Sequence, residues 1–318
     1  MDPARDWTRS NVPALAGRRV LITGANSGIG YEAARLLADR GAAVTFACRD
    51  EARGRAALER LRAGMPDADV ALLQLDLADL GALREAVERW RVDHDQLHVL
   101  INNAGVMAPP LRRTADGFEL QFGVNHLGHF ALTGLLFDVL RATPGARVVT
   151  VSSSAHRAGY VAFDDLNWEH RRYHPWRAYG QSKLANLLFT SELQRRSAAA
   201  GLDVDALAAH PGYAATELQR RGPQMRGNSF RAGLSGLSNQ LFAQDAAHGA
   251  LTTVAAAGLA DARGGDYYGP DGRFEMRGLP ARAPVAPRAT DRTAAGLLWD
   301  RSEQLTGVTF GALRVRSA

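Results

Sequence analysis

Short apolar runs alternate with longer amphipathic stretches from residue 19 onward. The apolar runs predict strands at 19–23, 43–47, 70–75, 97–101, 147–152, 203–208 and 266–268. Apolar positions that recur every three or four residues predict helices at 29–40, 51–63, 79–90, 116–140, 178–200, 244–257 and 291–306. This alternation is typical of parallel strands joined by covering helices. We therefore expect an α/β fold of the Rossmann type, a doubly wound parallel sheet of about seven strands with helices on both faces, in a single domain over residues 1–318.

Three segments depart from this alternation. Residues 155–177 are crowded with aromatic and histidine side chains, and residues 213–240 mix Gly and Pro with polar and apolar residues. Both segments leave the carboxyl ends of predicted strands, where open α/β sheets bind ligands, so we expect them to be substrate loops. The third segment, 278–318, begins with a stretch rich in Pro and Arg, to residue 287, that we expect to be irregular before the final helix.

The composition indicates a globular protein with a sizeable core. Hydrophobic residues make up 46% of the chain and charged residues 22%, which excludes a disordered chain, a collagen and a coiled coil. We find no apolar run long enough to span a membrane and no signal peptide, so we expect a cytoplasmic protein with no membrane partner. The net charge of +5 comes from arginines scattered between acidic residues, so we expect no nucleic-acid partner.

The chain has one cysteine, Cys48. A single cysteine excludes an intrachain disulfide and a cysteine-based metal cluster, and it suits a reducing compartment. We expect Cys48 to be a small buried apolar residue. The histidines show no zinc-ligand spacing, so we expect no metal.

A glycine-rich turn follows the first predicted strand directly and opens the first predicted helix. It reads Thr23-Gly24-Ala25-Asn26-Ser27-Gly28-Ile29-Gly30. Gly24 suits the tight turn, Gly28 lets the backbone approach a pyrophosphate, and Gly30 lets the helix pack closely on the strand. The phosphates would lie at the positive end of the helix. The turn therefore predicts a bound dinucleotide.

The end of the second predicted strand bears on which dinucleotide binds. An NAD-binding fold places an acid against the ribose 2′-hydroxyl there, but Cys48 takes that place. The planar fork of Arg49 suits a 2′-phosphate, and we interpret Asp50 as the N-cap of the next helix. We therefore expect NADP, with NAD possible. After the third strand, Asp76 (followed by Leu77) either bonds the adenine amino group or caps a turn.

Only one of the 38 basic residues is a lysine, Lys183. It comes four residues after Tyr179, so the two side chains share one face of a helix. An ammonium close to a phenol stabilises the phenolate and lowers its pKa from about 10 toward the working range of a general acid or base. An arginine would spread the charge over its wide fork. The pattern predicts that Tyr179 transfers a proton and that Lys183 assists it.

Further polar and small residues follow the predicted strands. The fifth strand ends in Ser152-Ser153-Ser154, and one of these hydroxyls would bond a substrate carbonyl. The fourth strand runs into Asn102-Asn103-Ala104-Gly105, whose small residues suit a loop that passes close under a cofactor. Asn125 lies within the next helical pattern, where a buried amide needs a partner such as water or backbone.

These residues together resemble the short-chain dehydrogenase/reductases, over the chain through about residue 270. The resemblance is carried by Thr23-Gly24-x-x-x-Gly28-x-Gly30, Asn102-Asn103-Ala104-Gly105, Asn125, Ser153, Tyr179-x-x-x-Lys183 and Pro211-Gly212. Within the family the chain is similar to the NADP-using retinol dehydrogenase and WW-domain oxidoreductase-like branch, in Ala47-Cys48-Arg49-Asp50, Asn102-Asn103-Ala104-Gly105-Val106-Met107 and Ser182-Lys183-Leu184-Ala185-Asn186. We find neither a WW domain nor a membrane anchor, so we expect a soluble, bacterial-type member.

The resemblance implies a role for each of the polar residues. Tyr179 would donate the proton in carbonyl reduction and accept it in alcohol oxidation. Lys183 would lower the pKa of Tyr179 and hold the nicotinamide ribose hydroxyls. Asn125 would hold a water that links Lys183 to solvent.

The resemblance assigns the substrate oxygen to Ser153. The family's serine precedes two small residues and then a glycine, but His156 stands at the glycine position here. Ser152 and Ser154 therefore stay open as alternatives to Ser153.

The resemblance also implies a cofactor site and a substrate lid. The loop after the sixth strand would contact the nicotinamide carboxamide, and residues 217–240 would form a lid over an apolar pocket with Met225 and Phe230. The expected cofactor-binding residues are Gly24, Asn26, Ser27, Gly28, Ile29, Gly30, Arg49, Asp76, Leu77, Asn103, Ala104, Gly105, Tyr179, Lys183, Pro211, Gly212 and Thr216.

We therefore expect an NADP(H)-dependent oxidoreductase that moves a hydride between the nicotinamide and a carbonyl or alcohol of a largely apolar small molecule, with Tyr179 as general acid or base. The alternative is a non-catalytic NADP-sensing protein that binds a partner through the same fold. The resemblance also suggests a homo-oligomer, a dimer or tetramer, built on the helices near 116–140 and 178–200.

Overall fold

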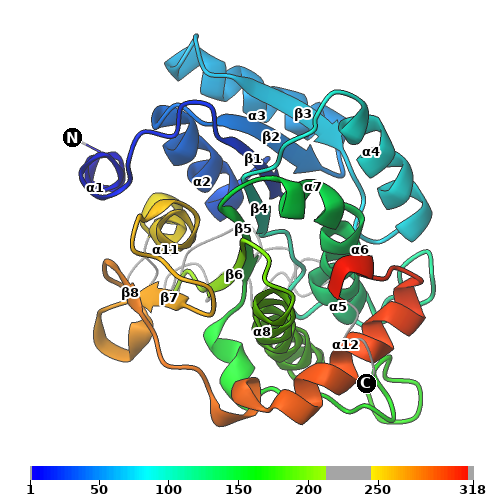
Figure 1. Cartoon of the computed structure of the whole chain (residues 1–318). Coiled ribbons are helices and arrows are strands. Elements are labelled where there is room, and N and C mark those ends of the chain that lie inside the picture. Colours follow the sequence, from blue (N-terminus) through cyan, green and yellow to red (C-terminus); the bar gives the residue numbers. More distant parts are fainter. Residues whose placement is uncertain (1, 213–244, 314–318) are drawn as a thin grey trace, which may run out of the picture.

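A computed structural model describes residues 2–212 and 245–313. These residues form a single α/β domain around an eight-stranded sheet in the order β3-β2-β1-β4-β5-β6-β7-β8 (Figure 1). The strands are β1 (Arg19–Thr23), β2 (Ala43–Cys48), β3 (Val70–Gln74), β4 (Val99–Asn102), β5 (Ala146–Val151), β6 (Val204–Ala209), β7 (Tyr267–Pro270) and β8 (Pro280–Arg282). The first seven pair in parallel, and β8 pairs antiparallel with β7. The predicted doubly wound parallel sheet is confirmed, and each of the seven predicted strands lies within two residues of its expected ends.

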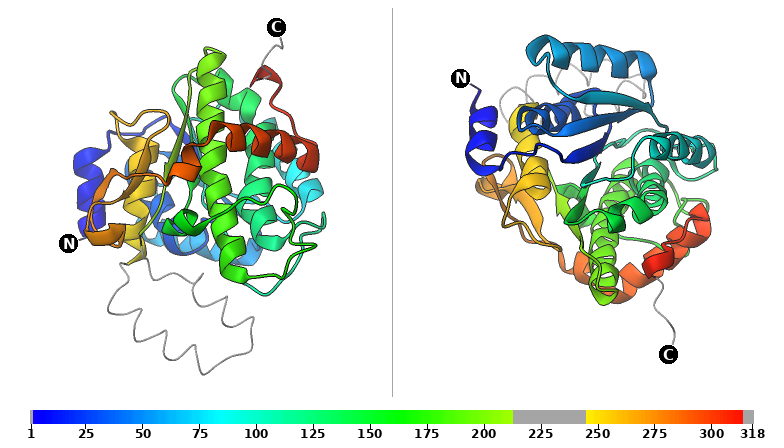
Figure 2. Two further views of the ribbon diagram at one scale, coloured as in Figure 1. Left: turned by 90° about the horizontal axis from the view of Figure 1, so that it is seen from below. Right: turned by 45° about the horizontal axis from the view of Figure 1, so that its top comes forward.

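Helices cover both faces of the sheet, and two further views show this layering (Figure 2). One face is covered by α1 (Pro3–Asn11), α2 (Gly28–Asp39), α3 (Glu51–Gly64) and α11 (Ala246–Gly258). The other face is covered by α4 (Leu80–Val92), α5 (Leu120–Phe122), α6 (Gly128–Leu135), α7 (Phe137–Ala142), α8 (Pro175–Ala199) and α12 (Arg292–Thr306). The shorter elements are a π-helix, η1 (Gly123–Leu127), and the 3-10 helices η2 (Ser154–Ala158), η3 (Arg273–Glu275), η4 (Pro287–Thr290) and η5 (Gly311–Leu313).

Each of the seven parallel strands contributes side chains to two separate cores, as the alternation of a β-strand requires. In β1, Val20 and Ile22 pack into the core beneath α2 and α11, whereas Leu21 packs into the core beneath α4 and α8. All three side chains are fully buried. Burial on both faces explains why the strands are continuous apolar runs.

The sheet order reverses between β1 and β4, so the loops after these strands diverge to opposite sides and leave a crevice at their carboxyl ends. Thr23 is the last residue of β1 and lies at the base of this crevice. Its hydroxyl oxygen accepts hydrogen bonds from the backbone N–H groups of Asn103 and Ala104, each at 2.9 Å. The glycine-rich turn and the loop after β4 are therefore fixed to each other.

The helix predicted at 116–140 is broken into four pieces, α5, η1, α6 and α7. The π-helix η1 inserts one extra residue per turn, and Asn125 lies inside it. At Gly128, the residue directly after η1, a Cβ would lie 2.5 Å from the carbonyl oxygen of Leu77. Apolar residues are buried both before and after η1, so hydrophobic spacing alone predicts one continuous helix.

Two other expectations need correction. The stretch 278–287, expected to be irregular, contains β8 and the start of η4. The helix α1 was not expected, because its sequence is mostly polar. It is held to α2 by Arg5 and Arg9, which both pair with the buried carboxylate of Asp39.

The C-terminal helix α12 crosses α8 (Figure 2) and also contacts α6. Trp299 of α12 packs its ring against Phe130 and Phe189, with centroids 5.2 and 5.9 Å apart. This part of α6 and α8 is thus covered by the chain itself. Across residues 2–212 and 245–313, none of the helices has the length and apolar character that crossing a membrane requires.

Candidate active site

Tyr179 and Lys183 lie one turn apart near the start of α8. The Lys183 Nζ atom is 5.7 Å from the centroid of the Tyr179 ring. The ammonium is buried and donates a hydrogen bond to the carbonyl oxygen of Val151, the last residue of β5, at 3.0 Å. The side chain of Lys183 therefore connects α8 to the carboxyl end of the central sheet.

Burial shifts the pKa of both groups. It raises the pKa of Tyr179 to about 12, although the nearby Ser153 hydroxyl acts in the opposite direction. It lowers the pKa of Lys183 to about 8. The expected lowering of the Tyr179 pKa is therefore not found in this structure, because desolvation of the phenol outweighs the effect of Ser153. Tyr179 keeps its proton at neutral pH.

The three serines after β5 have different surroundings. Ser153 lies close enough to the Tyr179 phenol to lower its pKa, and it accepts from the backbone N–H of Ala155 at 3.2 Å. Ser152 is buried and donates instead to the backbone carbonyl of Lys183 at 2.8 Å. Ser154 is exposed. Among the three candidates, Ser153 is the one that the structure brings to Tyr179.

The side chain of Asn125 connects the loop after β4 to α8. Its Oδ1 accepts from the N–H of Val106 at 2.8 Å, and its Nδ2 donates to the carbonyl of Val106 and to the hydroxyl of Ser182. A Cβ at Gly105 would lie 3.1 Å from Asn125 Oδ1 and 3.7 Å from Lys183 Nζ. Asn125 and Lys183 thus both lie close to Gly105, and the partners of the Asn125 amide are protein groups.

The glycine-rich turn forms a cradle that larger residues would fill. Gly24 and Gly28 have left-handed φ angles of 69° and 58°. A Cβ at Gly24 would lie 3.1 Å from Ala104, and a Cβ at Gly30 would lie 2.5 Å from both Asn103 Nδ2 and the Gly24 oxygen. The glycines are therefore required by close backbone approach as well as by conformation.

The first turn of α2 differs from that of its neighbours. Asp50, Asp79, Asp245 and Asp291 each accept a backbone N–H at the start of α3, α4, α11 and α12. Ser27, the N-cap of α2, makes no such side-chain hydrogen bond. The N–H groups at this positive helix end therefore remain for an anion, which fits the phosphates of a dinucleotide.

At the end of β2, Asp50 and Cys48 have the surroundings that their sequence context predicts. Asp50 accepts the backbone N–H of Arg53 at 3.0 Å, which confirms its predicted role as an N-cap. Cys48 is buried, as expected, and burial raises the pKa of its thiol to about 11. The backbone N–H groups of Ala25 and Asn26 act against this rise in pKa, so Cys48 lies close to the glycine-rich turn. Arg49 is exposed.

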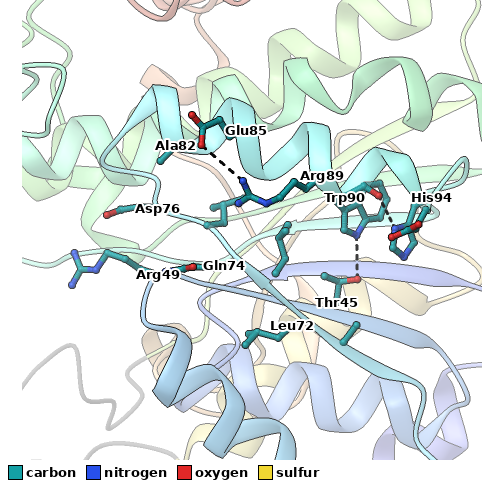
Figure 3. A pocket seen from close by; sticks show the side chains of 14 residues that line it. Thr45, Arg49, Leu72, Gln74, Asp76, Ala82, Glu85, Arg89, Trp90 and His94 are labelled. Atoms are coloured by element: carbon teal, nitrogen blue, oxygen red, sulfur yellow. Dashed lines mark hydrogen bonds and ion pairs between the residues drawn. The ribbon is translucent and has the colours of Figure 1, made fainter.

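A groove of about 860 Å³ runs between β3 and α4. Arg49 and Asp76 lie at one end of this groove, and Trp90 and His94 lie at the other (Figure 3). Asp76 Oδ1 accepts the N–H of Ala78 at 2.9 Å. The capping alternative for Asp76 is thus observed, while contact with adenine stays a prediction.

The loop after β6 is described only as far as Gly212. His210 is buried, and Pro211 and Gly212 lie at the carboxyl end of the sheet, with Gly212 in the left-handed region at a φ of 67°. Thr216 and the lid 217–240, with Met225 and Phe230, fall outside the described residues.

Two contacts of the site were missed in the sequence. Gln181, between Tyr179 and Lys183, donates to the carbonyl of Leu166 at 2.9 Å and accepts from Arg171 at 2.6 Å, so the segment 155–177 packs on α8. Glu275 bonds His210, the residue before Pro211. A polar residue at position 181, between Tyr179 and Lys183, is a sequence signal for the contact of Gln181. Nothing in the local sequence indicates the contact between Glu275 and His210.

Comparison with known proteins agrees with this geometry. Residues 18–227 match the family model described as short chain dehydrogenase. Retinol dehydrogenase 13 of Homo sapiens is 42% identical over 303 residues, which cover 94% of this chain and 88% of that protein. Retinol dehydrogenase 12 of Mus musculus is 42% identical over 298 residues, which cover 93% of this chain and 88% of that protein.

A crystal structure of an uncharacterised protein from Mycobacterium paratuberculosis is also similar. It is 46% identical, with a TM-score of 0.78 over 96% of this chain and 98% of that chain. The protein therefore belongs to the short-chain dehydrogenase/reductase family, in its retinol dehydrogenase-like branch, and is an NAD(P)-dependent oxidoreductase.

Proposed function

We propose that the protein transfers a hydride between NADP(H) and a carbonyl or alcohol of a largely apolar small molecule, with Tyr179 moving the proton. The observation that carries this proposal is the position of the Lys183 ammonium, 5.7 Å from the centroid of the Tyr179 ring, with Ser153 close enough to the phenol to act on its pKa. Proton transfer to a bound oxygen needs a proton donor and a hydroxyl that holds the oxygen beside it, and Tyr179 and Ser153 would supply these two groups.

In this mechanism the bound nicotinamide supplies or accepts the hydride. Tyr179 holds its proton at neutral pH because burial raises its pKa, which suits a donor in carbonyl reduction. Ser153 would hold the substrate oxygen against the phenol. Alcohol oxidation needs the phenolate, and Lys183 is the cation close enough to stabilise it. Asn125 would keep the loop after β4 at its distance from Lys183, and its predicted water is part of this proposal.

The preference for NADP rests on the end of β2. Cys48 occupies the place of the ribose-binding acid and packs on the glycine-rich turn, while the adjacent Arg49 is exposed at the carboxyl end of the sheet. A guanidinium there suits a 2′-phosphate, and Asp50 is engaged as a helix cap. NAD stays a possible second cofactor.

The substrate class rests on the relatives. Two similar proteins are named retinol dehydrogenases, which favours an apolar alcohol or its aldehyde. Residues 155–177 and 213–240 remain our candidate substrate loops. We also propose a cytoplasmic location and a homo-oligomer, a dimer or tetramer. Because α12 covers part of α6 and α8, the subunit contact would lie outside that face, and light scattering would measure the assembly.

The decisive experiment is steady-state oxidation of NADPH and, in parallel, of NADH across a panel of aliphatic, aromatic, steroidal and retinoid carbonyls, with Tyr179→Phe as the control. Turnover that is faster with NADPH and lost in Tyr179→Phe would support both assignments. Faster turnover with NADH would contradict the role of Arg49. NADPH binding without turnover of any carbonyl would favour the NADP-sensing alternative.

A further inference from the structure

Glu275 joins two loops of the active site through one carboxylate. It lies in η3, in the connection between β7 and β8. Its Oε1 accepts from the guanidinium of Arg157 at 2.6 Å, and its Oε2 accepts from Nε2 of His210 at 2.9 Å. Arg157 belongs to η2, which begins directly after Ser153, and His210 directly precedes Pro211. One side chain thus ties the exit of β5 to the exit of β6.

The hydrogen bonds of His210 fix the orientation of its ring. Nδ1 accepts the backbone N–H of Gly212 at 3.3 Å, so the ring proton lies on Nε2 and points at Glu275. The imidazole is fully buried and packs on the ring of Tyr267, with centroids 5.2 Å apart. A Cβ at Gly269 would lie 2.1 Å from His210 Nε2, so the strand β7 leaves the ring no space to turn. The carboxylate of Glu275 therefore acts on the backbone of Gly212 through a rigid intermediate.

The backbone that carries Glu275 is strained. Phe274 and Glu275 have φ angles of 57° and 54°, in the left-handed region that residues other than glycine rarely adopt. The Phe274 side chain is 72% exposed, so burial of its ring does not account for this conformation. The same segment presses on the β6 exit, because a Cβ at Gly212 would lie 2.6 Å from the carbonyl oxygen of Met276. Strain of this kind is often kept where a segment has a functional task.

A second contact ties the exit of β5 to the same region. His156 is buried, and its Nδ1 donates to the carbonyl oxygen of Ser153 at 2.7 Å. Its Nε2 accepts the N–H of Ala286, after β8, at 3.3 Å. The turn that carries Ser153 is thus held from the β7–β8 side at two points, at His156 and at Arg157.

We propose that Glu275 is a positioning residue, which holds the Ser153 turn and the Pro211-Gly212 turn at a fixed separation and so sets the substrate oxygen against the nicotinamide. This inference rests on the proposed function, in which Ser153 holds the substrate and Pro211-Gly212 contacts the cofactor. Glu275 itself would touch neither reacting group. Hydride transfer is sensitive to small displacements between its two partners, so loss of the link reduces the rate without removing a reacting group.

A purely structural role for Glu275 predicts a different outcome. The side chains of Arg157 and Glu275 are 40% and 18% exposed, and ion pairs so open to solvent contribute little to folding stability. Removing the pair should then change the melting temperature slightly and the kinetic constants not at all. A positioning role predicts that removing the pair lowers kcat/KM, while the melting temperature again changes only slightly.

The experiment compares Glu275→Ala, Glu275→Gln and Arg157→Met with the wild type, in NADPH-dependent turnover and in melting temperature. The control is Asp138→Asn, which removes the exposed ion pair of Asp138 with Arg141 on α7. We expect Glu275→Ala to lower kcat/KM about ten- to hundredfold, with a raised KM for NADPH. It should also lower the melting temperature below that of the control, because the buried Nε2–H of His210 loses its acceptor, whereas Arg157→Met keeps that acceptor and should melt like the control. Glu275→Gln should recover part of the loss, because its amide oxygen can still accept from His210.

Arg157→Met tests the other half of the link. Combined with Glu275→Ala, it should cost no more than Glu275→Ala alone, because both changes break one connection. Unchanged kinetic constants in Glu275→Ala, or kinetic losses in Arg157→Met that follow its melting temperature, would overturn the positioning role alone. A wild-type protein that neither binds NADPH nor turns over a carbonyl would overturn the proposed function and, with it, this inference.

Discussion

Lys183 and Val151 are joined by a hydrogen bond of 3.0 Å between the buried ammonium and the last carbonyl oxygen of β5. The same oxygen also accepts from Nδ2 of Asn186 at 3.1 Å. Burial lowers the pKa of Lys183 to about 8, which means that the folded protein holds the charged form at a cost. The chain thus keeps its single lysine at a position where a charge opposes folding, as a functional group would require.

Lys183→Met should therefore stabilise the protein while abolishing turnover. At pH 7 we expect the free energy of unfolding to rise by up to about 3 kcal/mol, since each unit of pKa shift corresponds to about 1.4 kcal/mol. Val151 would keep the hydrogen bond from Asn186, so no buried carbonyl loses its only donor. Urea unfolding of both proteins measures the difference.

The sign of the pH dependence gives a second test of the same variant. Between pH 8 and 10.5 the unfolded chain binds the lysine proton and the folded chain releases it, so the wild type gains stability relative to Lys183→Met as the pH rises. The gap between the two proteins should therefore shrink from pH 7 to pH 10. A variant that is less stable than the wild type at pH 7, or a constant gap, would contradict the pKa assignment.

Alanine substitutions of the three serines after β5 should have different effects on kcat and on stability. Ser153→Ala should lower kcat about a hundredfold, because the hydroxyl beside Tyr179 would no longer hold the substrate oxygen. Ser152→Ala should instead cost about 1 kcal/mol of stability, since it removes the buried hydrogen bond to Lys183. The exposed Ser154 provides the matched control, with neither effect expected. A larger kcat loss in Ser152→Ala than in Ser153→Ala would reverse the assignment.

Short-range spacing accounts for the parts of this protein that the sequence predicted well. Tyr179 and Lys183 share a helix face because they are four residues apart, whatever the rest of the chain does. The glycine-rich turn is likewise fixed by Gly24, Gly28 and Gly30, whose positions allow only a narrow set of backbone paths. Continuous apolar runs located the seven parallel strands because both faces of the sheet are buried.

Long-range contacts account for what the sequence did not reveal. The pKa of Tyr179 depends on burial, which only the folded chain provides. The hydrogen bond of Lys183 with Val151 likewise joins residues 32 positions apart in the sequence. Glu275 reaches His210 across 65 positions of sequence, so no local pattern links them. The π-helix η1 is invisible to hydrophobic spacing because its one-residue insertion is compensated by packing on both sides.

Arg49→Ala should change the choice of cofactor. If the guanidinium binds the 2′-phosphate, its loss should raise the KM for NADPH roughly ten- to hundredfold and leave the KM for NADH unchanged, because NADH lacks that phosphate. Arg55→Ala is the matched control, since Arg55 is an exposed arginine of α3 that pairs with Glu51 on the same helix. Equal changes for NADPH and NADH would show that Arg49 does not read the 2′-phosphate.

Gly30→Ala and Gly296→Ala make the same chemical change in two helices with opposite expected results. At Gly30 the new Cβ would lie 2.5 Å from the backbone oxygen of Gly24, so the turn must shift, and we expect a loss of about 1–3 kcal/mol in stability and weaker NADPH binding. At Gly296, in α12, the Cβ would meet no atom within 4 Å, so the lower backbone entropy of the unfolded chain should stabilise the protein by about 0.5–1 kcal/mol. Urea unfolding and NADPH titration of both variants measure these effects. Because Gly296→Ala should leave NADPH binding unchanged, a Gly30→Ala protein that binds NADPH as tightly as the wild type would show that close packing of this turn is not required for the cofactor.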